Sequence, residues 1–353
     1  MNILVLRYRF IGDTLLTVPF LRNLRRAYPG ARIDMVVAPY SSDVLIGTPY
    51  VDEFIVYDPP TVHADSSGQH RSFGQKARFI GSLREKGYDR AYVLKRSFSS
   101  AVIALLSGAR ERIGFDTEKR GFLLTKKVPY RHDRHEIQNF LSILAADGIP
   151  VTDDYLEAWL SEDEIDRANR FLAESGIGED QKVVGIHPFT ANMRRAWHED
   201  NFIDLANHIQ RKQGARVIIF GGKREIPLGK TFEERIDPPP IVAVGKTSLR
   251  ESMALLSKCA LLVCNDSGIM HLAAALDVPL IALFGPQSPV KFGPWGDDCT
   301  VVYKHFDCSP CQQKFFTECD PSERMKPMCM ETITTEEVIA IVDEKISVTM
   351  TRP

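Results

Sequence analysis

Short apolar runs alternate with amphipathic stretches along most of the chain. The run Asn2–Leu6 is apolar and β-branched, and a glycine-containing turn and apolar residues at helical spacing, from Leu15 to Leu24, follow it. This order predicts a strand, a loop and a helix. Similar runs at 33–38, 54–57 and 91–94 predict further strands. Strands that alternate with helices predict a parallel sheet of the α/β class.

The same alternation starts again in the second half. Strands are predicted over 183–187, 216–220, 261–264 and 280–284, and helices over 202–213, 248–258 and 270–276. Between the halves, from about 150 to 180, the sequence turns acidic and helical. We therefore expect two α/β domains, 1–170 and 171–330, and a C-terminal helix within 331–353. Residues 61–75 are polar without periodicity and predict a loop in the first domain.

The charge of the chain is nearly balanced overall but divided unevenly between its halves. The 353 residues carry 44 Lys and Arg and 46 Asp and Glu, a net charge of −2, so we expect no nucleic-acid partner. Residues 1–135 carry a charge of +9 and the remainder −11. Either the first half faces an anionic partner, or these charges are spread over solvated surface.

The sequence carries no signal for export or membrane insertion. No apolar run approaches the roughly 18 residues that span a bilayer, and the apolar N-terminus meets Arg7, Arg9 and Asp13 without a small-residue cleavage site. Seven cysteines, an odd number, fit a reducing compartment better than a disulfide framework. We therefore expect a cytoplasmic protein with no transmembrane segment.

Polar residues that directly follow the predicted strands are the first candidates for a site, because ligands of open parallel sheets bind beyond the carboxyl ends of the strands. Asp13 follows the first strand and precedes a helix, so it is either a helix cap or a general base. The loop before it lacks the GxGxxG pattern, and no GxxxxGK[ST] occurs in the chain. Both absences weaken dinucleotide-binding and P-loop interpretations.

The second half offers three such places. Asp266, Ser267 and Gly268 stand between a strand and a helix, where they either cap the helix or expose its backbone N–H groups to a phosphate. Thr190, Arg194 and Arg195 follow another strand, where an arginine either neutralises a diphosphate or pairs with a surface carboxylate. Glu225, after Gly221 and Gly222, either accepts hydrogen bonds from sugar hydroxyls or starts a helix.

Four cysteines gather late in the chain, at Cys308, Cys311, Cys319 and Cys329. Four thiolates can close a tetrahedral zinc site, but only Cys308 and Cys311 have the usual CxxC spacing. A structural zinc ion and separate reduced thiols both remain open.

Several of these segments resemble one family. The opening Ile3–Arg7 and Gly12–Pro19 are similar to the start of bacterial ADP-heptose:lipopolysaccharide heptosyltransferases, glycosyltransferase family 9. Later segments resemble the motifs of that family in the same order: His187-Pro188 with Thr190 and Trp197, Gly221-Gly222 with Glu225, Gly245–Leu249, Asn265–Ala275 and Phe284–Pro286. Together they cover nearly the whole chain.

The resemblance implies a GT-B fold, in which two Rossmann-like domains face each other across a cleft. It implies that the C-terminal domain holds an ADP-heptose donor, that a lipopolysaccharide inner-core acceptor lies on the N-terminal side, and that the final helix packs back toward the first domain. The implied reaction is an inverting transfer of heptose without a catalytic metal. It also places the protein, as a peripheral enzyme, at the inner membrane surface.

The resemblance also assigns roles to the candidate residues. Asp13 becomes the base that takes the proton of the acceptor hydroxyl, and Asp266 holds hydroxyls of the donor sugar. Ser267 and Gly268 start the helix whose N–H groups meet the diphosphate. Arg195 stands where the family has a phosphate-neutralising lysine, with Arg194 as the alternative. The remaining donor-binding residues are Thr190, Glu225 and His271, although the ring of His271 also fits packing or capping.

Three other functions stay open. A glycosyltransferase of the same fold can use another nucleotide-sugar or acceptor. A module that binds nucleotide without catalysis has the same strand-end motifs. An NAD-dependent oxidoreductase is less well supported, because its glycine fingerprint is missing from the first loop.

Overall fold

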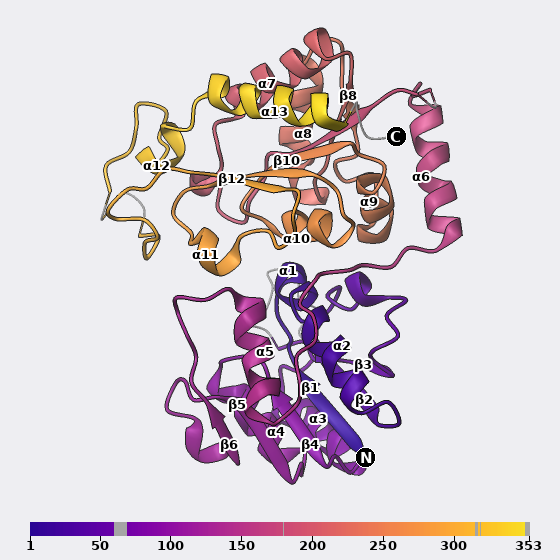
Figure 1. Ribbon diagram of the computed structural model, residues 1–353, viewed down its shortest axis with the longest axis vertical. Coiled ribbons are helices and arrows are strands. Elements are labelled where there is room, and N and C mark those ends of the chain that lie inside the picture. Colours follow the sequence, from indigo (N-terminus) through magenta and orange to yellow (C-terminus); the bar gives the residue numbers. More distant parts are fainter. Residues whose placement is uncertain (60–68, 179, 315–316, 318, 350–353) are drawn as a thin grey trace. The chain divides into compact units, whose positions relative to one another are not determined.

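The computed structural model describes residues 1–59, 69–178, 180–314, 317 and 319–349 (Figure 1). Contacts divide the chain into two compact units, Met1–Trp159 and Leu160–Pro353. The domain boundary expected at residue 170 falls inside helix α6 (Glu162–Glu174), which packs on α9 (Leu249–Leu256) in the second unit. Each unit has its own sheet. Of the loop predicted over 61–75, residues 61–68 lie outside the described residues.

The first unit is a six-stranded parallel sheet in the order β3-β2-β1-β4-β5-β6. The strands are β1 (Asn2–Leu6), β2 (Arg32–Val37), β3 (Glu53–Val56), β4 (Arg90–Val93), β5 (Glu111–Phe115) and β6 (Lys126–Val128). The helices are α1 (Ile11–Leu15), α2 (Val18–Ala27), α3 (Phe73–Glu85), α4 (Phe98–Leu106) and α5 (Glu136–Ala146). The predicted parallel α/β organisation is confirmed.

Helical spacing from Leu15 to Leu24 predicted one helix, and the structure has two. Helix α1 ends at Leu15, and α2 begins at Val18 with Pro19 in its first turn. Proline lacks a backbone N–H and has a fixed φ, so it suits the first turn of a new helix and not the interior of a continuous one. The break places the short helix α1 directly after β1, where the candidate Asp13 lies.

The second unit repeats this architecture with the strand order β12-β11-β10-β7-β8-β9, all parallel. Its strands are β7 (Val183–His187), β8 (Arg216–Ile219), β9 (Ile241–Val242), β10 (Leu261–Asn265), β11 (Leu280–Phe284) and β12 (Cys299–Tyr303). Besides α6 and α9, its helices are α7 (Glu199–Lys212), α8 (Ile226–Arg235), α10 (Gly268–Ala275), α11 (Pro289–Phe292), α12 (Met328–Glu331) and α13 (Thr335–Thr349).

One face of the second sheet packs into a buried apolar cluster that includes helices of the same unit. Val184 and Ile186 of β7 lie in one buried cluster with residues of α7 and with Val338 and Val342 of α13. Helix α13 packs on α7, and the two lie together in Figure 1. The C-terminal helix therefore completes the core of the second unit. Its approach to the first unit stays a prediction. None of the helices in the described part of the chain is long and apolar enough to cross a membrane.

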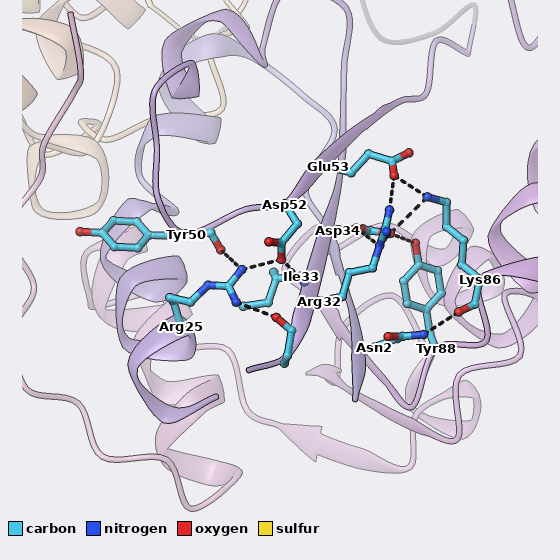
Figure 2. Close-up of polar contacts among 11 residues, drawn as sticks. Asn2, Arg25, Arg32, Ile33, Asp34, Tyr50, Asp52, Glu53, Lys86 and Tyr88 are labelled. Carbon is cyan, nitrogen blue, oxygen red and sulfur yellow. Dashed lines mark hydrogen bonds and ion pairs between the residues drawn. The ribbon is translucent and has the colours of Figure 1, made fainter. Parts of the chain in front are cut away.

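A network of charged side chains joins β2 and β3 near the ends where these strands begin (Figure 2). Asp34 on β2 is fully buried, and its carboxylate accepts a hydrogen bond from Tyr88 Oη at 2.8 Å. The Asp34 carboxylate also lies 3.0 Å from Arg32 Nε and 3.3 Å from Lys86 Nζ, and Lys86 pairs with Glu53 at 2.7 Å. Ligands of parallel sheets bind at the opposite, carboxyl ends of the strands. We therefore assign this network to the stability of the sheet.

An ion pair between Glu164 and Arg250 links α6 to α9 in the second unit. Arg250 Nη2 lies 2.5 Å from Glu164 Oε2, and only 13% and 11% of these two side chains are exposed. Glu164 also accepts a hydrogen bond from the Ser161 backbone, as the third residue of a capping box. The hydrogen bond from Arg250 lowers the pKa of Glu164 to about 2.

We expect acid to weaken the second unit through this pair. Glu164 titrates near its ordinary pKa of 4.5 in the unfolded chain, so the pair stabilises fully above that pH and is lost as the pH falls toward 2. Glu164→Gln should lower the free energy of unfolding by on the order of 2 kcal/mol at neutral pH, and by under half of that near pH 3. Urea titrations of both proteins at the two pH values measure the difference. Equal losses at both pH values would contradict this role.

Candidate active site

Asp13 lies in α1, directly beyond the carboxyl end of β1. Phe10, not Asp13, is the N-cap residue, and no side chain caps α1, so the capping interpretation of Asp13 is wrong. Asp13 Oδ1 instead lies 3.0 Å from Arg7 Nη2. The side chain of Arg7 is 5% exposed and that of Asp13 is 18% exposed. A buried cation thus holds the carboxylate, which itself stays accessible to solvent.

Basic side chains gather where β1 and β4 end side by side. Arg7 and Arg9 follow β1, and Lys95 and Arg96 follow the neighbouring strand β4. Lys95 Nζ donates to the Tyr8 carbonyl oxygen at 3.2 Å and lies 4.0 Å from the centre of the Tyr8 ring. Burial, and then the charges of Arg9 and Arg7, lower the pKa of Lys95 to about 8. Sequence reasoning did not single out these four residues as one group, although each follows an apolar strand.

In the second unit the structure brings two predicted donor residues together. Asp266 follows β10, and Arg195 lies in a short 3₁₀ turn, Met193–Arg195, after the neighbouring strand β7. Arg195 Nη1 is 3.7 Å from Asp266 Oδ2, and the two side chains are 18% and 19% exposed. Burial raises the pKa of Asp266 to about 6, against the opposing charge of Arg195. The Arg195 guanidinium and the Asp266 carboxylate therefore lie next to each other, and both are only partly exposed to solvent.

Helix α10 begins without a cap from the side chain at its N-cap position. Ser267 occupies that position, but its side chain makes no cap hydrogen bond. Ser267 Oγ lies instead 3.2 Å from His187 Nδ1 and 3.2 Å from the Asn265 carbonyl oxygen. Burial lowers the pKa of His187 to about 4, so its ring is neutral at neutral pH. The amino end of α10, which begins at Gly268, presents the positive end of a helix dipole.

The other predicted donor residues lie at the same edge of the sheet, because β10, β7 and β8 are neighbours. The Thr190 hydroxyl donates to the Asn192 carbonyl oxygen at 2.6 Å within its own loop. Arg194 is exposed, Glu225 stands at the start of α8 after β8, and His271 is buried within α10. Thr190 and Arg194 thus follow β7, the strand next to β10, Glu225 follows β8 beyond it, and His271 lies in the helix that follows β10 itself.

Asn265 holds the loop after β7 in place, a role that the sequence did not reveal. It is fully buried at the end of β10. Its Oδ1 accepts from the Trp197 backbone N–H, and its Nδ2 donates to the Pro188 carbonyl oxygen, both at 2.9 Å. These two bonds fix both ends of the loop that carries Thr190 and Arg195. The signal in the sequence was a polar residue that ends an otherwise apolar strand.

Asn265→Leu should therefore destabilise the protein and loosen this loop. Two buried backbone groups lose their partners, which costs roughly 3 kcal/mol of unfolding free energy. Urea unfolding measures this loss. Asn207→Leu is the matched control, because Asn207 makes one exposed hydrogen bond to the Asp237 backbone, and we expect it to cost under about 1 kcal/mol. Similar losses for both variants would contradict the assigned role.

The four late cysteines share one neighbourhood. Cys329 is buried, and its pKa is raised to about 12 by burial and then by the charges of Cys311, Cys308 and Cys319. The Gln313 backbone N–H donates to Cys311 Sγ at 3.3 Å. Within the residues that the structure describes, no three His, Cys, Asp or Glu side chains are arranged to hold a metal ion. The arrangement gives no support to the zinc hypothesis.

Comparison with known proteins identifies the family. The model of "Glycosyltransferase family 9 (heptosyltransferase)" matches residues 76–319. Lipopolysaccharide heptosyltransferase 2 of Escherichia coli is 30% identical over 318 residues, which cover 86% of this chain and 88% of the relative.

Solved structures agree with this assignment. A family 9 glycosyl transferase from Veillonella parvula has a TM-score of 0.84 at 25% identity, and the match covers 98% of this chain and 97% of the other. The E. coli ADP-heptose lps heptosyltransferase II has the same fold, with a TM-score of 0.79 at 24% identity, over 99% of this chain and 100% of the other. The two Rossmann-like units are therefore those of a GT-B protein. The family model matches well over half of the chain, so the chain belongs to glycosyltransferase family 9.

Proposed function

We propose that this glycosyltransferase moves heptose from ADP-heptose to an inner-core sugar of lipopolysaccharide, with inversion at the anomeric carbon. The observation that carries the proposal is Asp13, a solvent-accessible carboxylate that lies at a strand end against a buried arginine. A carboxylate in that setting suits a general base. The relative from E. coli supports heptose as the transferred sugar and lipopolysaccharide as the acceptor, because its name is lipopolysaccharide heptosyltransferase 2.

The proposed step uses one proton transfer and one displacement. Asp13 takes the proton of the acceptor hydroxyl as the hydroxyl oxygen forms a bond to the anomeric carbon of heptose. The bond between that carbon and the diphosphate oxygen breaks on the opposite face, and ADP leaves with the electron pair. Attack opposite the leaving group inverts the anomeric configuration. Asp13 needs only to be ionised and close to the hydroxyl.

The second unit supplies the groups that such a leaving group needs. A departing ADP gains negative charge on its diphosphate, which fixed positive groups stabilise. We assign this task to Arg195 and to the amino end of α10 at Ser267 and Gly268. Asp266 binds hydroxyls of the heptose, and Thr190, Glu225 and His271 complete the pocket, with Arg194 at its exposed side. These groups supply the charge, so the proposed chemistry calls for no metal ion.

The first unit is suited to an anionic acceptor. Arg9 is exposed, and among the described residues neither Arg9 nor Lys95 has a carboxylate within ion-pair distance. Burial, and then repulsion by Arg9 and Arg7, lowers the pKa of Lys95, and an anion bound between these cations would offset the repulsion. Lipopolysaccharide core sugars carry such anions. We propose that the enzyme works from the cytoplasmic side, at the surface of the inner membrane where this acceptor lies.

Selective stabilisation by nucleotides tests the donor assignment. A ligand that binds only the folded state raises the melting temperature, so we expect ADP to stabilise the protein more than UDP, GDP or NAD at matched concentrations. A stronger response to UDP or GDP would replace heptose by another donor sugar, and a response to NAD alone would favour an oxidoreductase. Stabilisation by ADP without turnover of ADP-heptose on any core acceptor would favour a binding module.

A further inference from the structure

We propose that Arg7 and Glu136 form a positioning pair that aims the carboxylate of Asp13 at the acceptor. This inference rests on the proposed role of Asp13 as the base. It gives a positioning role to two residues that sequence reasoning did not select as site residues. Neither is argued to touch the substrate; both act through Asp13.

Arg7 is fixed from several directions. Its backbone N–H continues the sheet by donating to the Val36 carbonyl oxygen at 3.1 Å, and its guanidinium carbon lies 5.0 Å from the centre of the Phe140 ring. One terminal nitrogen, Nη2, is 3.0 Å from Asp13 Oδ1 and 3.8 Å from Glu136 Oε1. The arginine therefore lies between two carboxylates, one buried and one accessible to solvent.

Glu136 is a buried carboxylate, and its burial carries a desolvation cost. Its side chain has no exposed surface, and its Oε2 accepts one hydrogen bond, from Tyr130 Oη at 2.7 Å. Among the described residues its Oε1 has no hydrogen-bond partner, and it lies 3.8 Å from both Arg7 Nη2 and Arg96 Nη2. A buried carboxylate held mainly by charge at that distance costs more than a neutral side chain would. The negative charge of Glu136 compensates the buried positive charge of Arg7, and we assign this as its main contribution.

The pair leaves one oxygen of Asp13 for the substrate. Arg7 holds Oδ1, and no hydrogen bond or ion pair within the described residues engages Oδ2. Asp13 lies in a five-residue helix whose N-cap residue gives no side-chain support, so the arginine supplies the restraint that the helix lacks. Precise orientation of a reacting group lowers the barrier of the chemical step without strengthening ground-state binding. A loss of Arg7 should therefore appear in kcat and not in KM.

The test compares Arg7→Met, Arg7→Lys and the control Arg110→Met in the full chain. Arg110 is exposed and stands before β5, at the opposite end of the sheet from Asp13. We expect Arg7→Met to lower kcat by on the order of 10–100-fold with both KM values within about twofold. Arg7→Lys should recover at least about a tenth of the wild-type kcat, because it keeps a positive charge near Oδ1, and Arg110→Met should match wild type.

A double-mutant cycle separates positioning from a general loss of structure. In the Asp13→Asn background, Arg7→Met should change kcat by under about threefold, because its partner is already lost. If Arg7→Met does not fold, Arg7→Met with Glu136→Gln removes both buried charges and takes its place in the same cycle.

The outcomes distinguish this inference from the proposed function. Independent, multiplicative losses from Arg7→Met and Asp13→Asn would overturn the positioning role and leave Asp13 as the base. A rise in acceptor KM with kcat unchanged would also overturn it, because Arg7 would then be a binding residue. A wild-type kcat in Asp13→Asn itself would overturn the proposed base, and the inference with it.

Discussion

Asp13→Asn is expected to lower kcat by roughly 10²–10⁴-fold, the range that general bases contribute. The amide has nearly the shape of the carboxylate but cannot take the proton of the acceptor hydroxyl. Because donor contacts are assigned to the second unit, the affinity for ADP-heptose should stay within about twofold of wild type. Steady-state kinetics and donor titration on the same preparation measure both quantities.

The matched control for Asp13→Asn is Glu85→Gln. Glu85 is an exposed carboxylate in the last turn of α3, in the same unit, and its replacement should leave kcat unchanged. An Asp13→Asn variant that keeps wild-type kcat would show that another group takes the proton. A loss of donor affinity in place of kcat would move Asp13 from catalysis to binding.

Arg195→Met should cause the second large loss, of on the order of 10²–10³-fold in kcat/KM. This is the magnitude that follows the removal of one group that stabilises developing negative charge. Asp266 then loses the cation 3.7 Å away, so its pKa should rise further above 6. The acidic limb of the profile of kcat/KM against pH should move to higher pH as a consequence. Kinetics across pH 5–8 with ADP-heptose measure both effects.

Comparison with the neighbouring arginine tests this assignment. Arg194 is exposed and stands on the same short turn, so Arg194→Met should reduce kcat/KM much less than Arg195→Met. The reverse order of effects would transfer the neutralising role to Arg194. Arg195→Lys should recover only part of the loss, because lysine keeps the charge but not the planar, forked geometry of arginine.

The central strands could be predicted from the sequence because they are buried on both faces. Such strands read as continuous apolar runs, and Asn2–Leu6 and Leu280–Phe284 have the predicted bounds. Strands β5, β6, β9 and β12 were not predicted. Strand β9 has two residues, β6 begins with two lysines, and β5 begins with Glu111-Arg112. Tertiary pairing, not local pattern, makes β5, β6 and β9 strands.

One residue of β5 shows how pairing with the neighbouring strand β4 restricts which side chain fits. A Cβ atom on Gly114 would lie 2.8 Å from the Val93 carbonyl oxygen of the neighbouring strand. Glycine is therefore required there by close approach of β4, although it weakens an isolated strand pattern. A reading of the sequence alone has no access to this contact.

The same distinction applies to the site. Asp13, Arg195 and Asp266 could be selected because each follows a predicted strand, which is where ligands bind in such sheets. The roles of Arg7, Glu136 and Asn265 could not be predicted from the sequence, because these roles depend on contacts between distant segments. Glu136 looks like an ordinary first-turn acidic residue of α5, and only the fold brings it to Arg7. Asn265 acquires its role from Trp197 and Pro188 on another loop.

The most direct test of the account is mass spectrometry of a lipopolysaccharide inner-core acceptor after incubation with the purified protein and ADP-heptose. We predict that the acceptor gains the mass of one heptose residue and that an equal amount of ADP appears. Both products should fall together in Asp13→Asn. Release of ADP without a heavier acceptor, or transfer from UDP- or GDP-sugars but not from ADP-heptose, would contradict the account.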